Sequence, residues 1–286
     1  MRRSRVATAA ACALVAASIA LAPHPVRSQQ AAPTARPEGI LGATDHRVPL
    51  TPDAWPWSSI GRVNVVQGPN HRSFCTGTLI GPVQVLTAGH CLFDTRINTF
   101  VKPHQVHFVA GQARDDKFQG HSIAVAITTD PDFHFAVEER PRYDQIRADM
   151  VVHDWAIITL KDDLRLKPIP WRTIRRADLP NAGETGEVAR AGYSADRPFL
   201  LSIHRGCRAK TDEPRPGFLL HQCDSMPGDS GSPVLLLKGD SASIIGIHTV
   251  VEQSFEPGVG YRAMAGRGVA ASAFEQAAAA ALAGKP

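Results

Sequence analysis

The hydrophobic and polar positions of this chain form short runs, apolar or alternating, that are separated by Gly, Pro, Asn and Asp. Runs of this length between turn residues are typical of β-strands. The strands that we predict span residues 62–67, 73–80, 83–87, 105–110, 122–128, 155–160, 187–193, 199–205, 218–222, 233–237, 243–250 and 259–264. Many short strands without a visible internal repeat indicate β-barrels or a β-sandwich. The alanine-rich residues 269–282 predict a helix near the C-terminus.

The segment Gly228-Asp229-Ser230-Gly231-Ser232-Pro233 is the most informative chemical motif. It places Ser230 between residues with little or no side chain, in a turn that exposes its hydroxyl. A serine hydroxyl is a poor nucleophile until a base removes its proton. Because the segment alone also fits an ordinary glycine-serine turn, its interpretation depends on finding a base and a group that orients it.

His90, in Leu86-Thr87-Ala88-Gly89-His90-Cys91, is the best candidate base, since it closes an apolar run beside a cysteine that can fix its backbone. Asp154 lies where the apolar run 155–160 begins, and a carboxylate there can orient the imidazole and stabilise its protonated form. Taken singly, His90 also fits a packed histidine and Asp154 a turn residue. The order His, Asp, Ser along the chain favours a catalytic triad.

With these motifs, residues 40–265 resemble the trypsin-like, chymotrypsin-fold serine endopeptidases. The resemblance implies an all-β fold of two six-stranded antiparallel β-barrels, with the active site in the cleft between them and a C-terminal helix. The domains that we expect are a signal peptide at 1–28, a propeptide or linker at 29–39, an N-terminal barrel at 40–170, a C-terminal barrel at 171–266 and a helical segment at 267–286.

The resemblance also assigns roles to the motif residues. His90 acts as the base, Asp154 orients it, and Ser230 attacks a peptide carbonyl to form an acyl-enzyme. The backbone N–H groups of Gly228 and Ser230 form the oxyanion hole. The reaction needs no cofactor and no metal ion.

The residues predicted for the substrate pocket favour two different substrate preferences. Asp224 lies six residues before Ser230, where trypsin has the carboxylate that attracts Arg or Lys. His248 lies in a segment that resembles the bacterial glutamyl endopeptidases, in which that histidine helps to receive an acidic side chain. Thr249, Val251 and Gly258 match other positions of the substrate-binding site. The preference for a basic or an acidic residue therefore stays open, and Asp224 and His248 neutralise each other if they pair.

Activation by cleavage is a further expectation from the resemblance. In trypsin-like enzymes the aspartate before the nucleophile pairs with a new N-terminal amine, and Ile40-Leu41-Gly42 resembles the start of such a mature chain. Cleavage before Ile40, or alternatively before Gly39, would bring the amine to Asp229. Asp229 also fits a turn residue.

The N-terminus has the pattern of an export signal: Arg2, Arg3 and Arg5 precede an apolar run at 6–22. A membrane anchor is the alternative, but the run is short and alanine-rich. Cys12 lies in this segment, which leaves Cys75, Cys91, Cys207 and Cys223, an even number that favours disulfides in an exported chain. Three pairings are possible. The resemblance favours Cys75 with Cys91 and Cys207 with Cys223.

Composition limits the possible partners. A net charge of +4 with both signs mixed along the chain gives no basic stripe of the kind that nucleic acid requires. We therefore expect a secreted or periplasmic monomer that acts on proteins or peptides, with no nucleic acid and no stable membrane anchor. The alternatives are a non-catalytic binding protein on the same scaffold and an extracellular metal binder, although the histidines are too dispersed to favour a metal site.

Overall fold

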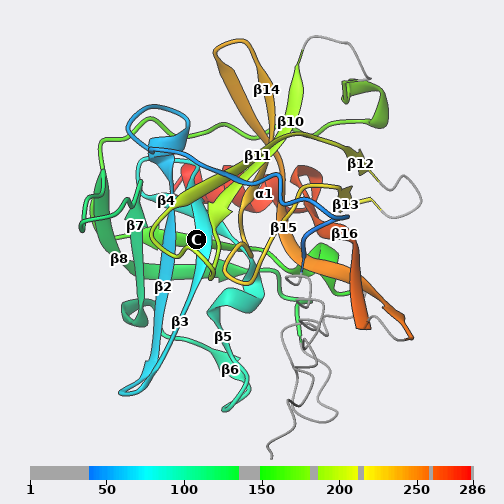
Figure 1. The fold of residues 1–286 in the computed structure, drawn as a ribbon. Helices are drawn as coiled ribbons and strands as arrows, with labels where there is room; N and C mark the ends of the chain where they lie inside the picture. The colour runs from blue at the N-terminus through cyan, green and yellow to red at the C-terminus, as the bar shows by residue number, and fades with distance from the viewer. Residues whose placement is uncertain (1–38, 135–148, 181–185, 212–215, 258–259, 285–286) are drawn as a thin grey trace, which may run out of the picture. The chain divides into compact units, whose positions relative to one another are not determined.

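Six strands of the first half of the chain form a closed antiparallel barrel in the computed structural model (Figure 1). The structure describes residues 39–134, 149–180, 186–211, 216–257 and 260–284, which belong to the unit 36–286. Around the barrel the order is β2-β3-β4-β9-β8-β7. The strands are β2 (Ile60–Gly68), β3 (His71–Leu79), β4 (Gln84–Thr87), β7 (Val106–Ala110), β8 (Gly120–Thr129) and β9 (Ala156–Leu160).

Side chains at alternate positions fill this barrel, as the period of a β-strand requires. Val63 and Val65 of β2 and Phe108 of β7 are almost completely buried. Gly61 lies against the Phe108 ring, where a Cβ atom would overlap the ring. The glycine thus makes room for the largest side chain that β7 places in the core.

The second half of the chain forms an eight-stranded antiparallel sheet of order β1-β11-β10-β14-β15-β16-β13-β12. Its strands are β1 (Val48–Pro49), β10 (Glu187–Tyr193), β11 (Leu201–Cys207), β12 (Ala209–Thr211), β13 (Phe218–His221), β14 (Pro233–Lys238), β15 (Ser241–Glu256) and β16 (Gly260–Ala270). Only Arg208 separates β11 from β12, and its carbonyl accepts a hydrogen bond from the Gln222 amide at 2.7 Å. Because β11 is the second strand at one side of the order and β12 is the last strand at the other, this continuity brings the sheet back on itself.

The remaining elements are short. Strands β5 (Phe93–Asp94) and β6 (Thr99–Phe100) pair with each other. The 3-10 helices are η1 (Trp57–Ser59), η2 (Gly89–Leu92), η3 (Pro103–Gln105), η5 (Val151–His153) and η6 (Arg176–Asp178). Two of them, η2 and η5, carry or adjoin the candidate catalytic residues.

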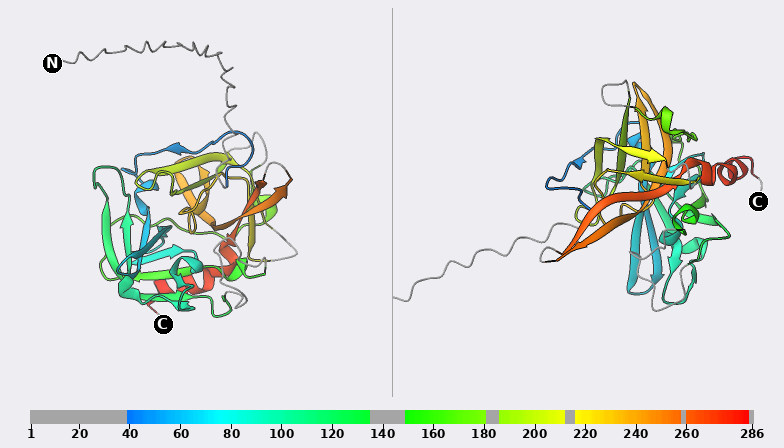
Figure 2. Two further views of the ribbon diagram at one scale, coloured as in Figure 1. Left: turned by 60° about the horizontal axis from the view of Figure 1, so that its bottom comes forward. Right: turned by 90° about the vertical axis from the view of Figure 1, so that its right-hand side faces the viewer.

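One α-helix lies in the described ranges, α1 (Ala271–Leu282), which follows β16 directly and is drawn red in Figures 1 and 2. Phe274 and Ala278 face the core and are fully buried. At the other end of the helix, Gln84 Nε2 of β4 donates a hydrogen bond to the Ala281 carbonyl at 3.2 Å. The helix thus runs from the second sheet to the first barrel. In this part of the chain no helix combines the length and apolarity of a membrane span.

The structure confirms the predicted all-β class, the six-stranded barrel and the C-terminal helix. The second half differs in detail from a six-stranded barrel, because β1 and β12 extend its sheet at both edges. Strand β1 comes from the N-terminal part of the chain but pairs with β11 of the second half.

Candidate active site

His90 and Asp154 are held together by two hydrogen bonds. His90 lies in η2, just after β4, and Asp154 follows η5 and precedes β9, the strand that pairs with β4. The His90 backbone N–H donates to Asp154 Oδ1 at 2.7 Å, and the ring Nδ1 lies 2.7 Å from Oδ2. Since a carboxylate only accepts, Nδ1 carries the hydrogen. Both residues are buried, so the carboxylate fixes the position and the tautomer of the imidazole.

Ser230 lies in a turn that is held in place by hydrogen bonds from a strand of the first barrel. The Thr76 amide donates to the Ser230 carbonyl at 2.9 Å, and Thr76 Oγ1 donates to the Gly228 carbonyl at 3.0 Å. Gly228 and Gly231 have positive φ angles of 93° and 80°. A Cβ atom on Gly231 would overlap the Thr76 carbonyl and the Thr87 hydroxyl. Both glycines are therefore required by the turn that presents Ser230.

His90 and Ser230 line the same cavity, whose volume is about 270 Å³. Met226, Gly228, His248 and Val251 are among its other lining residues. The Ser230 hydroxyl donates a hydrogen bond to the Thr249 carbonyl at 3.2 Å. His90 and Ser230 thus meet at one cavity, and Asp154 is hydrogen-bonded to His90, although the three residues are far apart in the sequence.

The backbone amides of Gly228 and Ser230 also belong to this turn. Neither amide donates a hydrogen bond to an acceptor within the ranges that the structure describes. The amides of Asp229 and Gly231, by contrast, do donate hydrogen bonds. The Asp229 amide donates to the Met226 carbonyl at 3.0 Å, and the Gly231 amide donates to the His248 carbonyl at 2.7 Å. Two donors beside the hydroxyl of Ser230 remain available for an acceptor that enters the cavity.

Asp229 is fully buried and has a charged partner that the sequence analysis missed. Arg190 Nη1 of β10 lies 2.7 Å from Asp229 Oδ1, and both side chains have no solvent exposure. The Ser194 hydroxyl and the Met226 amide each donate to Asp229 Oδ2 at 2.7 Å. In the intact chain the counter-ion of Asp229 is thus a guanidinium, and the nitrogen of Ile40, which was expected to become that partner, belongs to a peptide bond.

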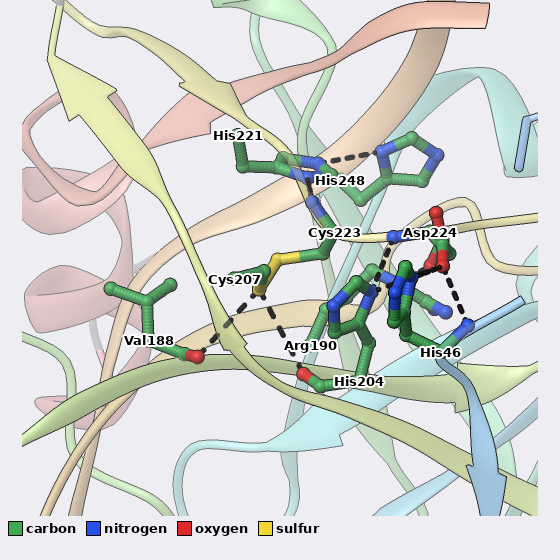
Figure 3. The surroundings of a disulfide bond; sticks show 9 residues. All are labelled: His46, Val188, Arg190, His204, Cys207, His221, Cys223, Asp224 and His248. Atoms are coloured by element: carbon green, nitrogen blue, oxygen red, sulfur yellow. Dashed lines mark hydrogen bonds and ion pairs between the residues drawn. A yellow bond between two sulfur atoms is a disulfide. The ribbon is translucent and has the colours of Figure 1, made fainter. Parts of the chain in front are cut away.

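Asp224 is directed toward the N-terminal segment (Figure 3). Its Oδ1 accepts a hydrogen bond from the Leu41 amide, and its Oδ2 accepts one from the His46 amide, both at 2.8 Å. His46 Nδ1 lies 2.9 Å from the same Oδ2. Asp224 is fully buried and lines a second cavity, with His46 and His204, and not the one that holds Ser230. Its charge is therefore used to hold residues 41–46 to the second sheet.

His248 lines the cavity of Ser230 and pairs with a second buried histidine, His221 (Figure 3). His221 Nε2 lies 2.9 Å from His248 Nδ1, and the Cys223 amide donates to His221 Nδ1 at 3.2 Å. Because His221 Nδ1 accepts, its Nε2 carries the hydrogen and donates to His248 Nδ1. This order of donors leaves the hydrogen of a neutral His248 on Nε2. His248 therefore has His221 and not Asp224 as its partner in the described structure.

Burial keeps both histidines neutral. Desolvation, together with the positive charge of Arg190, lowers the pKa of His221 to about 3. Desolvation, with repulsion from His221, also holds the pKa of His248 well below its ordinary value. An imidazole that stays neutral in the folded state takes up a proton more readily when the chain unfolds.

Acid should therefore destabilise the fold. Below about pH 6.5 the unfolded chain protonates these histidines and the folded chain does not, so the free energy of unfolding is expected to fall by on the order of 1 kcal/mol per pH unit for each of them. Urea unfolding between about pH 7 and 5 measures this slope. The His221→Gln variant should have a shallower slope, whereas the exposed control His71→Gln should retain it. Equal slopes in all three proteins would contradict this origin.

Three further residues were predicted to belong to the substrate-binding site, namely Thr249, Val251 and Gly258. Val251 lines the cavity beside Gly39. Thr249 also lines it, and its hydroxyl donates to the Arg267 carbonyl at 3.1 Å. Gly258 lies outside the described residues.

Both expected disulfides are formed. Cys75 of β3 bonds to Cys91 of η2, with Cα atoms 6.1 Å apart, so the bond ties the residue after His90 to the barrel. Cys207, at the end of β11, bonds to Cys223, with Cα atoms 5.0 Å apart. Cys223 lies between His221 and Asp224, so this bond fixes the segment that carries both side chains (Figure 3).

Arg190 and His221 are the functional residues that sequence reasoning missed. Arg190 is the single charged residue in the otherwise small and apolar run 188–193, and His221 ends the apolar run 218–220. A charge placed centrally in a buried strand is a signal for a buried partner. The sequence does not identify that partner, because it depends on how β10 lies against the turn at 226–232.

Three groups of potential metal ligands occur among the described residues. In each group hydrogen bonds or covalent bonds already use ligand atoms. The sulfurs of Cys75 and Cys91, beside His90, are joined in a disulfide. The second group consists of His46, His204 and Asp224, and in it His204 Nδ1 accepts a hydrogen bond from the Asp224 amide at 2.8 Å. The third group consists of Asp130, Asp132 and His153, in which Asp130 Oδ2 accepts from Trp155 Nε1 at 3.0 Å and lies 3.1 Å from His153 Nδ1.

Comparisons with known proteins agree on one family. The family model described as Trypsin matches residues 48–264. Over 171 residues the chain is 32% identical to serine protease 23 of Rattus norvegicus, a match that covers 56% of this chain and 42% of that protein. Over 231 residues it is 29% identical to the proclotting enzyme of Tachypleus tridentatus, covering 72% and 58%. The chain thus spans less than two thirds of the length of these relatives.

Solved structures of serine proteases share the fold. A Glu endopeptidase has a TM-score of 0.60 and 20% identity, covering 85% of this chain and 99% of that one. The thermostable serine protease AL20 has a TM-score of 0.55, also with 20% identity, covering 79% and 98%. At this level of identity the likeness concerns the fold.

Proposed function

This chain belongs to the trypsin family, and on that premise we propose that it is a serine endopeptidase with His90, Asp154 and Ser230 as its catalytic triad. The observation that carries the proposal is the paired hydrogen bonding of His90 to Asp154 at 2.7 Å, at the edge of the cavity that Ser230 also lines. A buried carboxylate that holds an imidazole in this tautomer leaves the other ring nitrogen without a hydrogen, so that nitrogen can accept the proton of a neighbouring hydroxyl.

The reaction begins when the Ser230 hydroxyl turns from the Thr249 carbonyl toward His90 Nε2. Ser230 Oγ attacks the peptide carbonyl carbon while its proton passes to Nε2, and Asp154 stabilises the imidazolium. The imidazolium then gives the proton to the departing amine as the C–N bond breaks, which leaves an ester on Ser230. Water, activated by the same imidazole, hydrolyses the ester.

The amides of Gly228 and Ser230 are the donors proposed for the oxyanion. Charge develops on the carbonyl oxygen during attack, and fixed N–H groups stabilise it most where water is excluded. The absence of acceptors for these two amides in the described ranges supports this role. Removing one such donor typically costs on the order of 10²- to 10³-fold in kcat.

We propose that the residue before the scissile bond is acidic. The contacts of Asp224 with Leu41 and His46 support this choice, because they direct its carboxylate away from the cavity. His248, with its Nε2–H as donor, is suited to an acceptor side chain. Of the two preferences that the sequence left open, the chemistry of the cavity thus favours Glu or Asp over Lys or Arg.

Replacing His248 by Val should therefore lower kcat/KM selectively. The loss of a hydrogen bond to a charged group predicts a decrease of roughly 10- to 100-fold for peptides with Glu at this position. Peptides with Ala there should change much less, and they serve as the control. A wild-type enzyme that prefers Lys or Arg would contradict the proposed specificity.

The chain is proposed to be exported and matured. Residues 1–28 and 29–39 are the proposed signal peptide and propeptide or linker, and the disulfides support an oxidising compartment. Cleavage before Gly39 or Ile40 remains the proposed maturation step. Because Arg190 already neutralises Asp229 in the intact chain, we propose that this cleavage is not needed to organise the turn of Ser230. N-terminal sequencing of the active protein tests the site of cleavage.

Incubation of the purified chain with a peptide library tests the proposed function. Internal cleavage, mapped by mass spectrometry, should be observed with the wild type and be absent with Ser230→Ala. The control is Ser241→Ala, since Ser241 is exposed and its hydroxyl donates to the nearby Lys238 carbonyl; this variant should cleave as the wild type does. Binding of peptides without any cleavage would instead favour a non-catalytic binding protein.

A further inference from the structure

Strands β15 and β16 extend past the rest of their sheet as a two-stranded ribbon (Figures 1 and 2). Neighbouring β13 pairs with β16 only at residues 266–269. Farther out, described residues 253–256 of β15 pair with 260–263 of β16 and with no other strand. The outer edges of this part of the ribbon are therefore not paired with another described strand, and residues 253–256 and 261–262 are exposed.

The two faces of the ribbon have different chemistry. Phe255 and Tyr261 are directly opposite each other, their ring centroids are 5.4 Å apart, and they are 62% and 70% exposed. The ion pair of Glu256 with Arg262, at 3.3 Å, also lies in the ribbon. Glu256 neighbours Phe255 in sequence, so the two side chains point to opposite faces. An exposed aromatic pair backed by a charged face marks an interaction site more often than scattered apolar residues do.

The aromatic pair continues a face that already lines the cavity of Ser230. Beyond the β-bulge at 248–250, residues 251, 253 and 255 alternate onto one face of β15, and Val251 and Gln253 line the cavity. Phe255 is the next member of this series. At the rise of a β-strand it lies about 13 Å beyond Val251.

We propose that Phe255 and Tyr261 form an accessory binding site for the substrate polypeptide, which receives an apolar side chain outside the cavity. This inference rests on the proposed function. An extended peptide has the same rise per residue as β15. Consider a substrate that runs along the strand with one residue beside Val251. The substrate residue four positions farther along then lies against the aromatic pair.

Binding to the Ser230→Ala chain tests this site without any need for turnover. The probes are fluorescent peptides with Glu at the proposed cleavage position and either Leu or Ser three to five residues away, on the N-terminal or the C-terminal side. Anisotropy should show about tenfold tighter binding of the Leu peptide, on one side only, as expected for partial burial of one apolar side chain. Adding Phe255→Ser and Tyr261→Ser should abolish this difference.

The control is Phe118→Ser, which removes an exposed aromatic residue close to β8, away from the ribbon. It should leave the tenfold preference unchanged. Equal binding of Leu and Ser peptides, or a preference that survives the double substitution, would overturn the accessory site. So would a wild-type dimer that the double substitution dissociates, since a second copy would then cover the pair. If the Leu peptide binds as expected but the wild type cleaves no peptide, the proposed function fails and the binding site stands.

Discussion

Asp154→Asn is expected to lower kcat about 10⁴-fold while the chain remains folded. The carboxylate accepts from both the backbone N–H and the Nδ1–H of His90, whereas an amide offers only one oxygen. If that oxygen accepts from the backbone, the amide NH₂ faces Nδ1 and forces the hydrogen onto Nε2. The imidazole then cannot take the proton of Ser230. If the amide is turned around, two buried donors face each other.

Steady-state kinetics with a Glu-containing peptide measures this effect, and circular dichroism checks the fold. Asp163→Asn is the matched control, because Asp163 lies exposed in the segment after β9 and should give a normal rate. A near-normal rate for Asp154→Asn would show that another carboxylate orients the base.

Arg190→Met is expected to destabilise the protein by about 3–5 kcal/mol and to remove most of its activity. Methionine fills much of the volume of the arginine, but it leaves the buried carboxylate of Asp229 without the guanidinium that lies 2.7 Å from it. Arg190 also donates to the Ser232 hydroxyl at 3.2 Å and to the Asp224 carbonyl at 2.9 Å. The side chain thus joins the turn of Ser230 to the segment that ends at Asp224, and its loss should disturb both.

Two further variants identify the cause. Arg205→Met removes a guanidinium from neighbouring β11 that pairs with Glu187 at the surface, and an exposed pair of this kind contributes less than about 1 kcal/mol. Adding Asp229→Asn to Arg190→Met should restore part of the stability, because it removes the unpaired charge. If Arg190→Met alone retains normal stability and activity, Asp229 must have another partner, such as the amine that cleavage before Ile40 would create.

The sequence predicts most strands because their burial is local. The predicted run 187–193 coincides with β10, and the strands of the first barrel agree with prediction within a few residues. Prediction is poorest at β1, β5, β6 and β12, which are only two or three residues long, and at the outer part of β15. There Gln253, Ser254 and Glu256 interrupt the apolar pattern, and only pairing with β16 makes the segment a strand.

The candidate site shows a similar division. Short motifs suggest His90, Asp154 and Ser230 as candidates, because each lies in a short segment of distinctive composition. The direction of Asp224 depends on the Leu41 amide, 183 residues away in the sequence, and the partner of Asp229 depends on an arginine in another strand. Such contacts follow from the packing of distant segments, so a count of residues before Ser230 does not reveal them.

The most direct measurement for the catalytic claim is reaction of the purified protein with a fluorophosphonate, followed by mass spectrometry of the peptides. A fluorophosphonate modifies a serine hydroxyl only when a base activates it. We predict an adduct on Ser230 in the wild type and in Ser241→Ala, and no adduct in Ser230→Ala. An unlabelled wild-type protein, or an adduct on a different serine, would contradict the account.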